Sequence, residues 1–168
     1  MRLSRYIAAI LLELAMIGST TAVQRTTMSQ SRVDLSVAAI RLGSSYSLVR
    51  AHLGRPTSDT TRRDDSMGSI ESVRTLQYRG VTVTLHKMRR EFRVASIDVT
   101  SSDWLVAPGL RIGLDAKQVI AKLGAPSEES NEGTRHRYHY LNAGGDGWAL
   151  LEFENNKLVR VRWSYDLS

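Results

Sequence analysis

Apolar residues recur along this chain with two periods, one typical of helices and one typical of strands. Between residues 116 and 123 they stand at i, i+3, i+4 and i+7, which places them on one side of a helix: Ala116, Val119, Ile120 and Leu123. Residues 46–53 keep part of this stripe, with Tyr46, Val49 and Leu53. The pattern therefore predicts two short helices, one in each half of the chain.

Residues with special backbone or capping chemistry mark the ends of both predicted helices. Ser45 and Asp115 precede the helices, and their side chains can accept hydrogen bonds from the first free backbone N–H groups. Gly54 and Gly124 follow the helices, each with a proline two residues later that cannot continue a helix. The same start and stop signals predict the same local structure in both places.

The two helices belong to a longer internal similarity. Residues 40–59 align with residues 110–129 at a constant offset of 70 and without a gap. The identical pairs are Arg41/Arg111, Gly43/Gly113, Val49/Val119, Ala51/Ala121, Leu53/Leu123, Gly54/Gly124 and Pro56/Pro126. Chance alone would give about one or two identities. The sequence therefore predicts one unit that occurs twice, at residues 37–103 and 104–168, after a linker at residues 23–36.

After each helix, apolar and polar residues alternate as in half-buried strands. The residues expected to face inward are Leu76, Tyr78, Val81, Val83, Leu85, Ala95, Ile97 and Val99, and then Tyr138, Tyr140, Ala149, Leu151, Phe153, Val159, Val161 and Trp163. The polar stretches 57–69 and 127–134 are expected to be irregular. Residues 142–147 and 154–157 are typical of hairpin loops, and residues 87–90 form a longer charged loop.

The predicted fold class is α+β, with two tandem units that each combine one helix with an antiparallel sheet of three strands. One helix per unit can cover only one sheet face, so the other face is expected to be open to solvent or a partner. On that face the first unit would carry Gln77, Thr82, Thr84, His86, Ser96 and Asp98, and the second Arg137, His139, Trp148, Leu150, Glu152, Arg160 and Arg162. The inward-facing residues of the two units are therefore similar in type, whereas the outward-facing residues differ.

The second unit's open face is basic and contains a tryptophan, a combination often found where proteins bind one another. The predicted partner-binding residues are Arg137, His139, Trp148, Leu150, Arg160 and Arg162. The alternative is that Trp148 packs on its own sheet beneath arginine stems. Nucleic acid is not expected as the partner, because a lone tryptophan is a poor platform for stacking bases.

The N-terminus predicts export. Residues 1–22 combine Arg2 and Arg5 with an apolar stretch at residues 7–17 and small residues at the end, as in a secretory signal peptide. Glu13 interrupts the stretch, and an ordinary N-terminal helix is the alternative. A transmembrane span would need roughly 20 apolar residues, so none is expected. The sequence thus predicts a periplasmic or secreted protein.

Composition narrows the chemistry further. The chain has no cysteine, which excludes disulfides, thiolate metal sites and lipid attachment at a cysteine. The 23 basic and 17 acidic residues give a net charge of +6. A surplus of this size attracts acidic surfaces, although it is also common on proteins that use it only for solubility.

The spacing of the shared residues resembles a known family. The pattern Gly-x5-Val-x3-Leu-Gly-x-Pro is carried by Gly43, Val49, Leu53, Gly54 and Pro56, and again by Gly113, Val119, Leu123, Gly124 and Pro126. With the strands that follow, it resembles the SmpA/OmlA (BamE-like) family of outer-membrane assembly proteins over roughly residues 37–166. Two such units in tandem also resemble the beta-lactamase-inhibitor-protein architecture. The resemblance implies a non-catalytic envelope or secreted protein that binds other proteins.

Motifs typical of enzymes are missing from the sequence. It contains no G-x-S-x-G, no phosphate-binding G-x-x-x-x-G-K-[ST] and no dinucleotide fingerprint. His136 and His139 are three residues apart in a predicted strand and point to opposite faces, which argues against a shared metal. We expect no catalytic residue, metal or cofactor. An outer-membrane assembly role, and a small hydrolase that uses His139 or Asp146, remain open alternatives, as does the oligomeric state.

Overall fold

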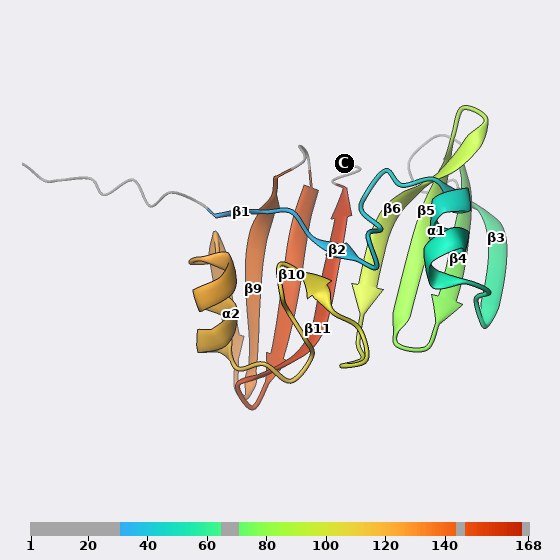
Figure 1. Cartoon of the computed structure of the whole chain (residues 1–168). Coiled ribbons are helices and arrows are strands. Elements are labelled where there is room, and N and C mark those ends of the chain that lie inside the picture. Colours follow the sequence, from blue (N-terminus) through green and yellow to red (C-terminus); the bar gives the residue numbers. More distant parts are fainter. Residues whose placement is uncertain (1–30, 65–70, 144–146, 166–168) are drawn as a thin grey trace, which may run out of the picture.

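The computed structural model describes residues 31–64, 71–143 and 147–165 (Figure 1). Within these ranges the chain forms two helices of eight residues each, α1 (Tyr46–Leu53) and α2 (Ala116–Leu123). The strands are β1 (Arg32–Val33), β2 (Ser36–Val37), β3 (Ser58–Asp64), β4 (Glu71–Tyr78), β5 (Val81–Met88), β6 (Glu91–Val99), β7 (Val106–Ala107), β8 (Glu128–Glu132), β9 (Arg135–Asn142), β10 (Gly147–Glu154) and β11 (Lys157–Tyr165).

Most of these strands belong to one continuous sheet. Its nine strands run in the order β1-β9-β10-β11-β6-β5-β4-β3, with β8 also paired to β9. Neighbours are antiparallel except for β1, which is parallel to β9. The predicted α+β fold of two tandem helix-plus-sheet units is therefore wrong: the protein is mostly β, and its strands form one large mixed sheet.

The sheet is continuous because the last strand of each half pairs with the other. Strand β6 lies antiparallel to β11, with Val99 opposite Val161 and Ile97 opposite Trp163. All four of these side chains are at most 2% exposed. An unpaired strand edge would leave backbone N–H and C=O groups without partners, and this pairing satisfies them while joining the two hydrophobic cores.

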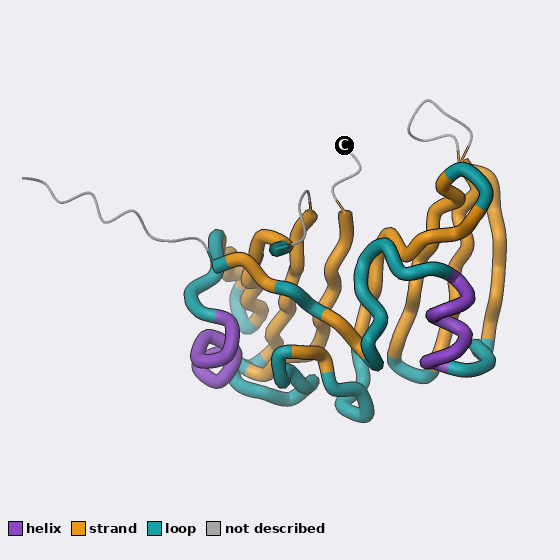
Figure 2. Tube along the Cα trace, turned by 45° about the horizontal axis from the view of Figure 1, so that its top comes forward, coloured by secondary structure: helices purple, strands orange, loops and turns teal. Residues whose placement is uncertain are grey.

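The helices cover little of the sheet, which corrects the expectation that they cover one face. A helix of eight residues is about 12 Å long, whereas eight strands side by side span roughly 34 Å. Figures 1 and 2 show the helices toward the two ends of the sheet, with the chain around β1, β2 and β7 crossing the middle on the same side. Extended segments therefore supply much of the covering layer, through the buried Val33, Leu35, Val37, Ile40, Val106 and Leu110.

The predicted helix ends are confirmed. The Ser45 side chain accepts a hydrogen bond from the backbone of the third helical residue, and Asp115 accepts one from Gln118 N at 2.9 Å. Gln118 Oε1 in turn accepts from Asp115 N at 3.0 Å, which completes a capping box. Gly54 and Gly124 follow the helices with φ of 72° and 81°, in the left-handed region that glycine adopts readily.

Two strands lie where irregular segments were expected. The polar stretches after the helices form β3 and β8, which pair with β4 and β9. Both lie at the outside of the sheet, and every residue of β8 is exposed, so no alternation of apolar residues marks them. The charged loop at residues 87–90 is also shorter than expected, because only Arg89 and Arg90 connect β5 to β6.

The inward positions are confirmed for most of the strands but not for Val159. Val159 is 38% exposed, whereas its neighbour Leu158 is fully buried. The pairing of β10 with β11 is irregular at this point: Phe153 lies opposite Leu158 and Glu152 opposite Arg160. Val159 is therefore the extra residue of a β-bulge, which shifts the alternation by one position.

The bulges also anchor the turns that precede the helices. A similar irregularity in β6 follows Val94. The backbone N–H of Gly43 donates to Val94 O at 2.8 Å, and that of Gly113 donates to Leu158 O at 2.7 Å. The same local bonding thus positions α1 and α2 in the two halves of the single sheet.

Candidate partner-binding face

The predicted partner-binding residues lie together on the side of the sheet opposite the helices. Their strands are adjacent: Arg137 and His139 belong to β9, Trp148 and Leu150 to β10, and Arg160 and Arg162 to β11. All six residues are partly exposed. We call this surface the polar face and define it by Arg137, His139, Leu141, Trp148, Leu150, Glu152, Arg160, Arg162 and Asp98.

One end of the polar face, around Trp148, carries apolar side chains. Trp148 lies directly opposite Leu141, and Leu150 follows two residues later on the same strand face. Side chains opposite each other on one sheet face are in contact distance. Sequence reasoning missed Leu141, although its two-residue spacing from His139 places it on the same face. The structure thus brings a tryptophan and two leucines into one partly exposed strip.

Asp98 organises the arginines of the polar face. It lies directly opposite Arg162 at the β6–β11 junction and accepts from Arg162 Nη2 at 3.2 Å. Arg160 donates to the same carboxylate through Nε at 2.9 Å and through Nη2. The hydrogen bond that Arg160 donates to Asp98 raises the pKa of Arg160, although burial of the guanidinium opposes this. The two arginines are therefore held in place by a carboxylate from the other half of the chain.

The polar face is consequently less basic than the sequence suggested. Asp98 offsets Arg160 and Arg162, and Glu152 Oε1 lies 4.0 Å from Arg160 Nη1. Arg137 is the most weakly paired arginine of the polar face, because its closest ion pair, with Glu132, spans 3.9 Å. Its side chain is 42% exposed. Arg137 is thus the cation that a partner could engage without breaking a short ion pair.

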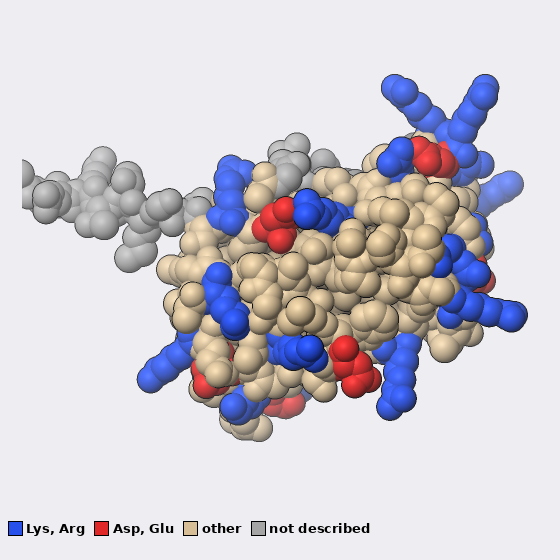
Figure 3. Space-filling model, in the orientation of Figure 1, with Lys and Arg blue, Asp and Glu red and all other residues tan. Residues whose placement is uncertain are grey.

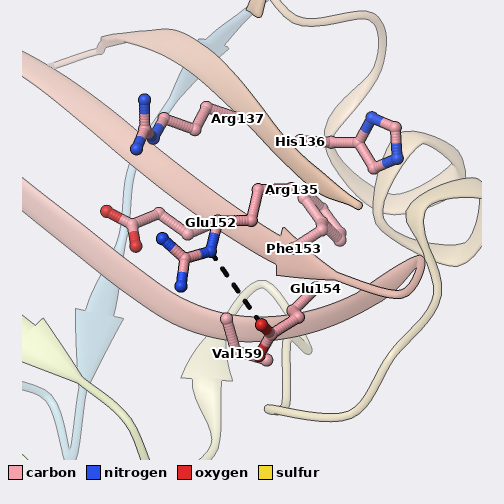
Figure 4. Close-up of a pocket in the computed structure, with 7 residues that line it drawn as sticks. All are labelled: Arg135, His136, Arg137, Glu152, Phe153, Glu154 and Val159. Atoms are coloured by element: carbon pink, nitrogen blue, oxygen red, sulfur yellow. Dashed lines mark ion pairs between the residues drawn. The ribbon is translucent and has the colours of Figure 1, made fainter. Parts of the chain in front are cut away.

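A pocket of about 200 Å³ opens at the other end of the polar face, beside Arg137 and Glu152 (Figure 4). It is lined by Arg135, His136, Arg137, Glu152, Phe153, Glu154 and Val159. Arg135 Nε lies 3.9 Å from Glu154 Oε1 across it. The bulge of β11 turns Val159 outward and so provides an apolar wall. Because basic and acidic side chains both line the pocket, it suits a small polar group, such as a side-chain amide or carboxylate of a partner.

In the part of the chain that the structure describes, no group of three or more His, Asp or Glu residues could hold a metal ion. His136 Nδ1 lies 2.6 Å from Asn131 Oδ1, and His139 lies on the polar face opposite Leu150. Asp146, which the hydrolase alternative requires, lies outside the described residues, as does the expected signal peptide at residues 1–22.

No helix among the described residues is long and apolar enough to cross a membrane. No family model matches the chain, and no curated protein matches it. The resemblance to the SmpA/OmlA family therefore gains no support from these comparisons.

Several solved structures show distant similarity. An extracellular protein containing an SCP domain from Bacillus anthracis str. Ames shares 20% identity at a TM-score of 0.46, over 74% of this chain and 44% of that one. A cysteine-rich secretory protein from Staphylococcus aureus subsp. aureus Mu50 shares 15% at a TM-score of 0.47, over the same fractions. This chain thus spans less than half the length of either protein.

A third similar structure is that of a protein from Streptococcus mutans provisionally assigned as a beta-lactamase inhibitor protein. It shares 16% identity at a TM-score of 0.29, over 75% of this chain and 85% of that one. Similarity at this level carries no inference about function.

Proposed function

We propose that this protein is a non-catalytic, exported binding module that engages another protein through the polar face. The observation that carries the proposal is the partly exposed strip of Leu141, Trp148 and Leu150 beside arginines held by ion pairs. Tryptophan and arginine supply much of the binding energy at protein interfaces. Because Asp98 already fixes Arg160 and Arg162, these side chains would lose little further freedom on binding.

The geometry favours a partner of particular chemistry. The strip around Trp148 calls for an apolar or aromatic side chain, and Arg137 calls for a carboxylate or amide that the nearby pocket could receive. Strands of a sheet present a broad and rather even surface, so the matching surface should be broad as well. Trp148 would then lie near the centre of the contact, where binding energy concentrates.

The proposal is tested by crosslinking the purified protein to extract from its own envelope and secreted fraction, followed by a binding measurement with the purified partner. Trp148→Ala should weaken binding about 30-fold or more, the effect of an interface residue worth about 2 kcal/mol. Arg137→Ala should weaken it less, because its side chain is more exposed. Circular dichroism should show the same fold for both variants.

Matched controls come from the other side of the sheet. Leu48 on α1 is 38% exposed, and Lys117 on α2 is exposed. Leu48→Ala and Lys117→Ala should leave affinity unchanged, since neither side chain lies on the polar face. If Trp148→Ala binds the partner as tightly as the unaltered protein does, the polar face is not the binding surface.

A further inference from the structure

The hairpin between β5 and β6 concentrates exposed positive charge at one end of the sheet. Lys87, Arg89 and Arg90 are all exposed, and none of them makes an ion pair with another described residue. Figure 3 shows lysine and arginine side chains fanning out where this hairpin lies. Met88 stands among them and is 45% exposed. The hairpin tip therefore combines three available cations with one exposed apolar side chain.

The backbone of this turn is unusual for the residues that form it. Arg89 has φ of 54°, in the left-handed region that side chains other than glycine, asparagine and aspartate rarely adopt. The corresponding turn of the other half, between β10 and β11, consists of Asn155 and Asn156 with φ of 49° and 63°. Asparagine is among the residues that suit such turns.

The arginine at position 89 is not what the folding of the turn requires. At position 89 the left-handed backbone favours asparagine, yet the first half places an arginine there, followed by Arg90, which does not share the positive φ. Strain that the fold does not require is often found where a side chain is needed for binding. Glu91, which directly follows the turn, is held in an ion pair by Arg93 and so does not offset the three cations.

We propose that the tip of the β5–β6 hairpin binds an anionic lipid surface. Lys87, Arg89 and Arg90 contact the headgroups, and Met88 enters the boundary between headgroups and acyl chains. The exposed methionine favours lipid over nucleic acid, because nucleic-acid sites pair cations with aromatic platforms rather than with a flexible aliphatic side chain. Because three cations make most of the contact, binding is expected to be reversible and steeply dependent on ionic strength.

The test is co-sedimentation of the full chain with vesicles of phosphatidylcholine, alone or mixed with phosphatidylglycerol. The unaltered protein should bind only the mixed vesicles, and added salt should release it. Each cation near an anionic membrane contributes about a fivefold change in affinity. Replacing both turn arginines with asparagine, Arg89→Asn with Arg90→Asn, should therefore weaken binding about 25-fold.

Two further variants distinguish the hairpin from charge in general. Arg55→Asn with Lys117→Asn removes the same net charge from exposed positions elsewhere and should leave vesicle binding nearly intact. Met88→Ser should weaken binding to vesicles but not to heparin, a soluble polyanion. The asparagine variant of the turn should also unfold at a temperature no lower than the unaltered protein, so its loss of binding cannot reflect unfolding.

Several results would overturn the proposal. One is that the unaltered protein fails to bind the mixed vesicles, and another is that the asparagine variant binds them as well as before. A third is equal capture by heparin with no effect of Met88→Ser on vesicle binding, which would assign the hairpin to a soluble polyanion. A fall in unfolding temperature on Arg89→Asn with Arg90→Asn would contradict the argument from the turn.

Discussion

Tyr140 links the stability of the fold to alkaline pH. Its side chain is fully buried beneath α2, and its hydroxyl donates a hydrogen bond to Gly124 O at 3.0 Å, just past the helix end. Burial, and to a lesser degree the neighbouring Tyr138 and Glu129, raises the pKa of Tyr140 to about 12. In the unfolded chain a tyrosine titrates with a pKa of about 10. Folding therefore favours the protonated phenol.

The direction of the effect follows from these two pKa values. The stabilisation from Tyr140 is complete below pH of about 10 and is lost as the pH rises toward 12, because the unfolded chain releases the proton first. A difference of about two pKa units corresponds to about 2.7 kcal/mol in total. At pH of about 11.5, the unaltered protein should have lost about 1.9 kcal/mol of this contribution.

Tyr140→Phe gives a variant in which this loss cannot occur. At neutral pH it lacks the hydrogen bond to Gly124 O and should be less stable by about 1 kcal/mol. Above pH of about 10.7 the loss in the unaltered protein exceeds that deficit, so the order of stability should reverse. Urea-induced unfolding, followed by circular dichroism across this pH range, measures both curves.

The difference between the two proteins is the informative quantity. Tyr78 and Tyr138 also have raised pKa values, chiefly because of burial, but they are present in both proteins and cancel in the difference. A constant gap between the two curves from neutral pH to about 11.5 would refute the reasoning. It would mean that the Tyr140 hydroxyl titrates alike in the folded and unfolded chains.

Two other predictions concern the sheet. Asp98→Asn should lower the free energy of unfolding by about 1–2 kcal/mol, because it weakens the hydrogen bonds to two arginines that are only about one-third exposed. In urea titrations, high salt should reduce the difference in stability between the variant and the unaltered protein. Equal stability at low salt would mean that the β6–β11 junction does not need the negative charge of Asp98. In the same assay, Leu158→Ala should lower the free energy of unfolding by about 2–5 kcal/mol, and Val159→Ala by less than about 0.5 kcal/mol. Similar losses of stability in the two variants would contradict the bulge in β11.

The sequence predicted those parts of the fold that depend on neighbouring residues. Ser45, Asp115, Gly54 and Gly124 act on backbone groups within one helical turn, so their roles could be inferred from residue type and spacing. The bulge in β11 departs from strict alternation, which is the only strand signal that local periodicity provides. The adjacent apolar pair of Leu158 and Val159 was the signal that could have indicated it.

The joining of the sheet could not be predicted in the same way. The pairing of β6 with β11 depends on two strand edges that lie more than sixty residues apart, and local periodicity carries no information about edges. Strands β3 and β8 were missed for a related reason, because strands exposed on the outside of a sheet need no apolar alternation.

The shared face of the six predicted residues could be inferred from the sequence, but Leu141, Asp98 and the electrostatics of the polar face were missed. Alternation along β9, β10 and β11 correctly placed all six residues on one face. Asp98, however, was assigned to a separate unit, so its contacts with Arg160 and Arg162 were not foreseen. The sequence thus indicated a basic surface where the structure has an ordered array of both charges.

The position of β1 determines when this protein can finish folding. Arg32 of β1 pairs with Leu141 of β9, more than one hundred residues later in the chain, and β11 is the last described strand. Contacts this distant in sequence form slowly, because a long loop must close before they stabilise anything. Synthesis delivers the first strand long before its partner exists. A chain truncated before β9 would therefore not be a smaller folded protein, because it would expose the edge of β6 and leave β1 without the strand that it pairs with.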